Sequence, residues 1–222
     1  MWRMARLRRV EQVERNRELL LAAARRVFLQ RGYSGASLEA VAEEAGFSKG
    51  VVYSQFGSKA DLFLALLEVR ISERAAQNRR VTARLAGAEG VRALLRTGSR
   101  DARAEPGWAA LLVEFRAVAG RDQQLNGRYA RAHERTVNEL ASVLGRLHER
   151  AGLEPLRPLR SMAELILAVG TGVALERAAN PAALPDEELL EWLPRALGLG
   201  EASHARPVKA TSSVATALKG DR

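Results

Sequence analysis

The side chains best suited to chemistry lie in residues 37–59, where hydroxyl, amine and amide groups recur among small and apolar residues. The pattern predicts two short helices, 38–45 and 49–56, each preceded by a serine that can cap it. Gly46 between them can take the positive φ of a tight turn, so the segment has the length and chemistry of a helix-turn-helix. Polar groups on the exposed face of the second helix could donate to phosphates and base edges in the major groove of double-stranded DNA.

The rest of the chain offers few residues that are suited to catalysis. There is no cysteine, which excludes thiol catalysis, disulfides and cysteine-ligated metals. The histidines form no His-x-x-x-His pair, and the glycines of residues 170–172 follow no predicted strand, so they are not a nucleotide-binding loop. Glu114 and His133 are a conceivable acid–base pair, but two such residues on different helices are a common coincidence. We therefore expect no enzyme, no catalytic residue, no metal site and no cofactor.

Positive charge is concentrated in the first half of the chain. The 222 residues include 35 Lys and Arg against 26 Asp and Glu, a net charge of +9. Residues 1–31 hold nine arginines against three glutamates and residues 69–100 hold eight against two, whereas residues 101–200 are slightly acidic. A polyanionic partner is favoured, because Lys and Arg release counterions from phosphates. We expect residues 1–15 to form a mobile basic arm, while the run 69–100 either flanks DNA or is a solvated helix face.

No membrane partner or targeting segment is expected. The apolar stretch 19–24 runs directly into Arg25 and Arg26, which does not suit a signal peptide. The apolar region 161–175 is interrupted by Glu164 and is shorter than the roughly 20 residues that span a bilayer. The sequence therefore predicts a cytoplasmic protein.

Apolar residues recur at helical spacing throughout, and strand-like alternation is nearly absent. Gly32 and Gly152 are expected to end two of the longer helices. We predict an all-α protein in which an N-terminal three-helix DNA-binding unit with a helix-turn-helix is followed by a larger helical ligand-binding and dimerisation domain. The expected boundaries are 1–15 for the basic arm, 16–68 for the DNA-binding domain, 69–200 for the second domain and 201–222 for a disordered tail.

Residues 16–67 resemble the DNA-binding domain of the tetracycline-repressor (TetR) family of transcriptional regulators over its whole length. The resemblance is carried by Ala22-Ala23, Phe28, Gly32-Tyr33, Ser37, residues 41–50, Val52-Tyr53, Phe56, Ser58-Lys59 and Leu62-Phe63. It implies that Ser37 and Ser48 cap the two helices and touch phosphate, and that Tyr53 and Lys59 contact phosphates. Together with the basic arm, the DNA-binding candidates are Arg6, Arg8, Arg9, Ser37, Ser48, Lys49, Gly50, Val51, Tyr53, Ser54, Gln55 and Lys59.

The second helix of the motif departs from the family pattern. Val51 replaces a small or hydroxyl residue, Ser54-Gln55 replace a His-containing pair, and Ala60 replaces a frequent Glu. Val51 could contact a thymine methyl group, and Gln55 could pair with adenine or a phosphate. The departures leave the operator sequence open without changing the expectation of DNA binding.

In the second half the resemblance is weaker and architectural. It implies a homodimer in which the last two long helices pair with those of the partner in a four-helix bundle. Residues 162–179 and 186–197 are the candidates, because they combine small residues with apolar ones. The dimerisation residues expected are Leu165, Ala168, Gly172, Leu189 and Leu193. The alternative is that some of these side chains pack inside one subunit.

A ligand pocket is expected among the middle helices, where apolar walls are combined with a few polar groups. The candidate residues are Trp108, Leu112, Phe115, Arg116, Tyr129, His133 and Thr136. The same stripe also suits an ordinary helix core, which is the more frequent use of aromatic residues at helical spacing.

Taken together, these features predict a homodimeric, ligand-responsive transcriptional regulator. The expected mode of action is repression, with an unidentified small-molecule effector releasing the protein from a palindromic operator. The alternative is a nonspecific or architectural DNA-binding protein without a ligand.

Overall fold

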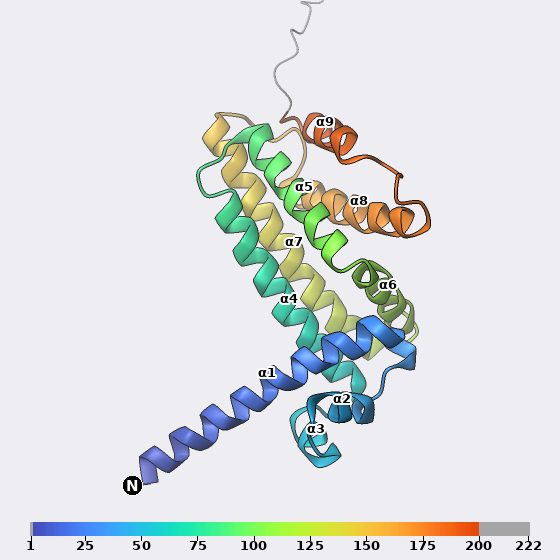
Figure 1. Ribbon diagram of the computed structural model, residues 1–222. Coiled ribbons are helices and arrows are strands. Elements are labelled where there is room, and N and C mark those ends of the chain that lie inside the picture. The colour runs from blue at the N-terminus through green and yellow to red at the C-terminus, as the bar shows by residue number, and fades with distance from the viewer. Residues whose placement is uncertain (1, 200–222) are drawn as a thin grey trace, which may run out of the picture.

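The computed structural model describes the backbone of residues 2–199 and the side chains of residues 11–199. This part of the chain is all-α and holds no strand, as predicted (Figure 1). Its helices are α1 (Trp2–Gly35), α2 (Leu38–Ala45), α3 (Lys49–Gln55), α4 (Lys59–Val81), α5 (Gly87–Ala104), α6 (Gly107–Ala119), α7 (Gln123–Ala151), α8 (Leu159–Ala179) and α9 (Asp186–Ala196). The tail predicted for residues 201–222 and the side chains of Arg6, Arg8 and Arg9 lie outside the described residues.

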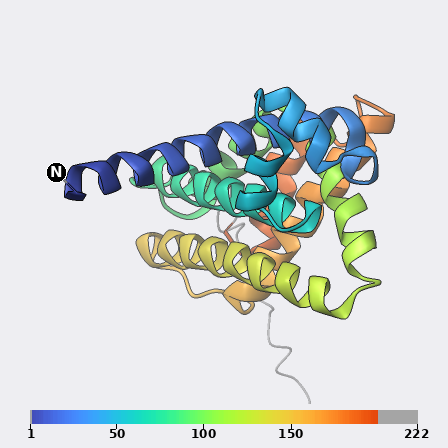
Figure 2. The ribbon, with the colours of Figure 1, turned by 90° about the horizontal axis from the view of Figure 1, so that it is seen from below.

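Helix α1 is longer than the sequence analysis predicted. Residues 2–15, expected as a mobile arm, are helical and continue without a break into the rest of α1. They contain no Gly or Pro, and five of them are Arg, a good helix former. Gly32 has φ 69° and ψ 177°, so the regular helix ends at Arg31, where a stop was predicted. The N-terminal end of α1 extends beyond the other helices in both views (Figure 1 and Figure 2).

The first hydrophobic core joins the N-terminal helices to the second half of the chain. Phe63 of α4 is fully buried, and its ring centroid lies 5.3 Å from that of Phe28 and 4.3 Å from that of Phe115. Tyr33, near the end of α1, lies 5.4 Å from Phe63 in an edge-on arrangement. Because α6 and α7 contribute to this core, the N-terminal unit packs directly on the second domain.

Helices α5, α7, α8 and α9 enclose a second core. At Gly90 of α5 a Cβ atom would lie 2.1 Å from Leu147 Cδ2, so the close approach of α5 to α7 requires glycine there. Leu193 of α9 is 7% exposed and belongs to this core. Its assignment as a dimer contact is therefore corrected: the side chain packs inside the subunit.

Candidate nucleic-acid interface and ligand cavity

Helices α2 and α3 form the predicted helix-turn-helix. Ser37 Oγ accepts a hydrogen bond from Ala40 N at 3.1 Å, which caps α2 as predicted. Gly46 has φ 71° in the left-handed region, and its N–H donates to carbonyl oxygens in the last turn of α2, so the turn forms as expected. Ser48 occupies the N-cap position of α3 but makes no side-chain cap bond, and it is exposed. The predicted capping role of Ser48 is thus corrected.

Helix α3 presents a polar face to solvent. Lys49, Gly50, Tyr53 and Ser54 are exposed, as predicted. A Cβ atom on Gly50 would meet nothing closer than Ser48 Oγ, at 3.9 Å. The fold itself therefore has room for a side chain at this position, and packing inside the chain does not explain the glycine.

Val51 and Gln55 lie at the border of this face. Both are half-buried, and Val51 packs against the first core. Gln55 Nε2 donates to Val13 O of α1 at 3.4 Å, a long hydrogen bond. Their predicted roles in reading bases therefore compete with contacts inside the chain.

Two predicted phosphate contacts have partners within the chain. Tyr53 Oη donates to Glu39 Oε1 at 2.8 Å, which raises the pKa of Tyr53. Lys59 Nζ donates to Tyr33 O at 2.7 Å and to Ser34 O at 3.1 Å, and it lies 4.7 Å from the centroid of the Tyr33 ring. A phosphate contact by Tyr53 requires exchange of its bond to Glu39, whereas Lys59 has one further N–H to offer.

A cavity of about 1180 Å³ lies among α4, α5, α6, α7, α8 and α9. Phe115, one of the seven predicted ligand residues, is fully buried and stacks on Phe63, so it belongs to the first core instead. The predicted stripe is thus partly core and partly cavity wall. The other six residues do line the cavity: Trp108, Leu112, Arg116, Tyr129, His133 and Thr136.

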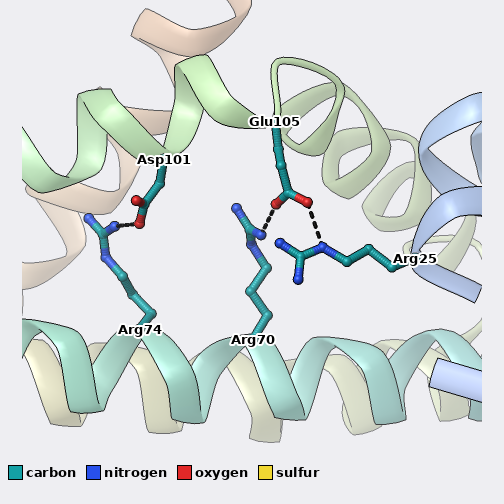
Figure 3. A network of polar contacts seen from close by, with 5 residues as sticks. All are labelled: Arg25, Arg70, Arg74, Asp101 and Glu105. Atoms are coloured by element: carbon teal, nitrogen blue, oxygen red, sulfur yellow. Dashed lines mark hydrogen bonds and ion pairs between the residues drawn. The ribbon is translucent and has the colours of Figure 1, made fainter. Parts of the chain in front are cut away.

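Where α1 borders the cavity, the wall is built from ion pairs (Figure 3). Glu105, at the C-cap of α5, accepts a hydrogen bond from Arg25 Nε of α1 at 2.5 Å and also pairs with Arg70 of α4. Next to it, Arg74 of α4 pairs with Asp101 of α5. Burial alone would raise the pKa of the Glu105 carboxyl, but the two guanidinium groups outweigh this effect and hold the pKa below its ordinary value. One carboxylate in the cavity wall thereby links α1 to α4.

These pairs also explain part of the basic run 69–100. Arg70 lies with its guanidinium carbon 4.1 Å from the Trp108 ring centroid, inside the cavity wall together with Arg74. Arg79 pairs with Glu139 of α7 at 2.6 Å on the surface. Arg70 and Arg74 are half-buried in ion pairs and fit neither alternative, whereas exposed Arg79 fits a solvated helix face.

The conceivable acid–base pair of Glu114 and His133 is not formed. Glu114 of α6 accepts hydrogen bonds from Tyr33 N at 2.7 Å and Ser34 N at 2.8 Å. Hydrogen bonds from Ser34 and Tyr33 lower the pKa of Glu114. The pKa of His133 is lowered first by burial and then by the nearby charge of Arg116. Glu114 thus fastens α6 to the α1–α2 junction.

Two family models account for most of the chain. Residues 20–66 match the model of bacterial regulatory proteins of the tetR family. Residues 69–199 match the model of the C-terminal domain of BetI-type transcriptional repressors. The chain belongs to the TetR family of transcriptional regulators.

Individual relatives agree with this membership. The chain is 31% identical over 141 residues to the HTH-type transcriptional repressor AcnR of Corynebacterium diphtheriae, covering 64% of this chain and 68% of that protein. It is 45% identical over 60 residues to the HTH-type transcriptional activator FasR of Mycolicibacterium smegmatis, a match of 27% of each chain. The solved structure of FadR from Bacillus subtilis in complex with stearoyl-CoA has a TM-score of 0.67 at 16% identity, covering 81% of this chain and 96% of that one. The last likeness shows the fold alone.

In this TetR-family chain, α8 leaves three dimerisation candidates on the surface. Leu165, Ala168 and Gly172 are exposed and share one helix face. Leu189 of α9 is half-buried and lines the cavity, as Ala168 also does. Trp192 of α9 is 52% exposed, although the sequence analysis did not single it out.

Sequence reasoning missed the charged groups that connect the two domains. Pro106 marked a helix boundary, but no local pattern shows that Glu105 meets Arg25, 80 positions away. The bonds of Glu114 to the α1–α2 junction carry no sequence signal either. Within residues 2–199, no helix is long and apolar enough to cross a membrane.

Proposed function

We propose that this TetR-family protein is a homodimeric repressor that a small molecule releases from a palindromic operator. Helix α3 enters the major groove with its exposed residues Lys49, Gly50, Tyr53 and Ser54 toward the DNA. The arginines of residues 3–9 precede this unit on the N-terminal part of α1 and add phosphate contacts.

A homodimer would present two such helices about one DNA turn apart, roughly 34 Å. The exposed face of α8 with Leu165, Ala168 and Gly172 supports an interface there, because small residues permit close helix approach and leucine adds apolar area. Exposed Trp192 of α9 is the large aromatic side chain that such an interface would bury.

The observation that carries the ligand response is the position of Glu105. Glu105 lines the cavity and at the same time holds Arg25 of α1, the helix on which α2 packs, and α3 in turn packs on α2. A ligand that favours another arrangement of this carboxylate also favours another position of α1. Only such differential binding can change the affinity for DNA.

The relatives support the direction of the response. AcnR is named a repressor, and FadR of similar fold was solved with stearoyl-CoA, which shows that this fold can hold a small molecule. FasR, matched over a shorter segment, is named an activator. We therefore propose repression, because the alignment to the repressor AcnR covers more of the chain than the alignment to the activator FasR.

DNA binding can be tested by fluorescence anisotropy with the intergenic DNA upstream of the protein's own gene. We expect salt-sensitive binding that is tighter than binding to a scrambled sequence by about 10³-fold or more. Equal affinity for both sequences at physiological salt would favour the nonspecific architectural alternative.

Dimerisation can be tested by light scattering coupled to size-exclusion chromatography. We expect a dimer for the full chain and monomers for Trp192→Glu. The control is Val113→Glu on α6, whose side chain is 38% exposed and distant in sequence from α8 and α9. A dimer that survives Trp192→Glu would remove this tryptophan from the interface.

A further inference from the structure

Most charged groups in the cavity wall are neutralised inside the chain. Arg25 and Arg70 share Glu105, and Arg74 pairs with Asp101. In the same wall, Arg103 and Arg177 share Asp186. The charges of these pairs cancel within the chain, so they need no charged group from a ligand.

Arg116 of α6 differs from these arginines. Within residues 11–199 its guanidinium has no ion-pair or hydrogen-bond partner, and its carbon lies 5.6 Å from the centroid of the Tyr129 ring. Arg96 also lines the cavity without an ionic partner in the described part of the chain, but no described aromatic ring lies against it. Arg116 is exposed to solvent, but it also lines the cavity and places a positive charge beside the ring of Tyr129.

Two further donors stand beside Arg116. Tyr129 and His133 are one turn apart on α7, with stacked rings 5.9 Å apart at an interplanar angle of 17°. Tyr129 is only 7% exposed and lines the cavity, yet its hydroxyl has no hydrogen-bond partner among the described residues. The ring of His133 also has no hydrogen-bond partner among the described residues. Both groups line the cavity without a hydrogen bond to the described residues, so they can donate to a bound ligand.

The donor set specifies the chemistry of that ligand. Arg116 can only donate, and Tyr129 and His133 can both donate, so the complementary group is an acceptor. The pKa of His133 is lowered, so Arg116 carries the positive charge among these three groups, and one negative charge on the ligand would match it. A carboxylate fits, because its two oxygens match the fork of a guanidinium.

The remainder of the cavity is largely apolar. Its wall includes Leu112 of α6, Leu140 of α7, and Ile166, Leu167 and Val173 of α8. A volume of about 1180 Å³ is enough for a sizeable apolar body beside a single polar group. Small hydrophilic anions would leave this wall facing water.

We propose that Arg116, Tyr129 and His133 bind the carboxylate of an apolar monocarboxylic acid whose hydrocarbon part fills the rest of the cavity. The proposal deepens the proposed function, on which it rests only in taking this cavity as the effector site. A thioester such as an acyl-CoA lacks the free carboxylate and carries several phosphate charges instead, so it is a competing outcome of the test.

Isothermal titration calorimetry with decanoate, decanol and decanoyl-CoA tests the proposal directly. We expect decanoate to bind about tenfold or more tightly than decanol, as a hydrogen-bonded charge pair predicts. Arg116→Gln should abolish this preference by weakening decanoate alone, and Tyr129→Phe should weaken decanoate by about threefold. Arg121→Gln, a change of an exposed arginine just beyond α6 that does not line the cavity, is the matched control and should change neither affinity.

Specific outcomes overturn the proposal. Equal affinity for decanoate and decanol, an unchanged preference in Arg116→Gln, or binding of decanoyl-CoA without decanoate would each refute it. Thermal melts followed by circular dichroism confirm that the variants are folded. DNA binding is measured separately. Selective DNA binding without a preference for the carboxylate would refute only the carboxylate proposal. A preference for the carboxylate without selective DNA binding would refute only the proposed function.

Discussion

Two glutamates fasten the DNA-binding unit to the second domain, and they do so in different ways. Glu105 holds the guanidinium groups of Arg25 and Arg70 and lines the cavity. Glu114 accepts two backbone N–H groups, those of Tyr33 and Ser34, and is not part of the cavity wall. Side-chain ion pairs can be rearranged by a ligand beside them, whereas a carboxylate that satisfies backbone donors fixes the path of the chain. We therefore expect Glu105 to be the contact that a ligand can rearrange and Glu114 to be the one that stays in place.

The largest expected effect separates these roles. Glu105→Gln should lower the free energy of unfolding by about 2 kcal/mol, because it leaves the half-buried Arg70 without a counter-charge. The affinity for operator DNA should also fall, since α1 loses its tie to the cavity wall. Urea unfolding and anisotropy measure the two quantities.

A matched control for Glu105 is Glu139→Gln, which removes a carboxylate from an exposed pair with Arg79. The free energy of unfolding should change by no more than about 0.5 kcal/mol, as is usual for exposed pairs. Equal losses in the two variants would mean that the pairs at Glu105 are ordinary surface contacts.

Glu114→Gln should cost about 1 kcal/mol in urea unfolding, since an amide oxygen is a weaker acceptor and serves only part of the donor pair at Tyr33 and Ser34. The affinity for decanoate should stay unchanged, because the residue lies outside the cavity wall. A change in ligand affinity as large as that of Glu105→Gln would end the distinction between the two glutamates.

The pH dependence of stability reports both carboxylates at once. The pKa values of Glu105 and Glu114 are lowered in the folded protein, so each stabilises the fold above the ordinary glutamate pKa of about 4.3 and loses this contribution as the pH falls below it. Unfolding free energies measured by urea between about pH 6 and pH 3 should therefore decline less steeply in each Gln variant than in the unaltered protein. An identical slope would show that the pKa of the altered carboxyl is not lowered by folding.

The sequence predicts the helix-turn-helix better than it predicts the cavity and the contacts between the two domains. Local signals carried the helix-turn-helix, because Ser37 and Gly46 act on neighbouring residues and produce their cap and turn without distant help. The same signals located six residues of the cavity wall but misplaced Phe115 and Leu193, whose burial depends on helices far along the chain. Contacts such as those of Glu105 form only when the helices pack together, so no periodicity or spacing in the sequence predicts them.

The smallest expected effect concerns Lys59, which binds the same α1–α2 junction as Glu114. Its ammonium group donates to Tyr33 O and Ser34 O, the carbonyls of the two residues whose N–H groups bind Glu114. Lys59→Met should lower the free energy of unfolding by about 0.5 kcal/mol and weaken DNA binding modestly, while the slope of log affinity against log salt stays unchanged. A slope that falls by about one unit would instead assign Lys59 a phosphate contact, as the family resemblance implies. Anisotropy titrations at several salt concentrations separate a lysine that positions the junction from one that binds DNA itself.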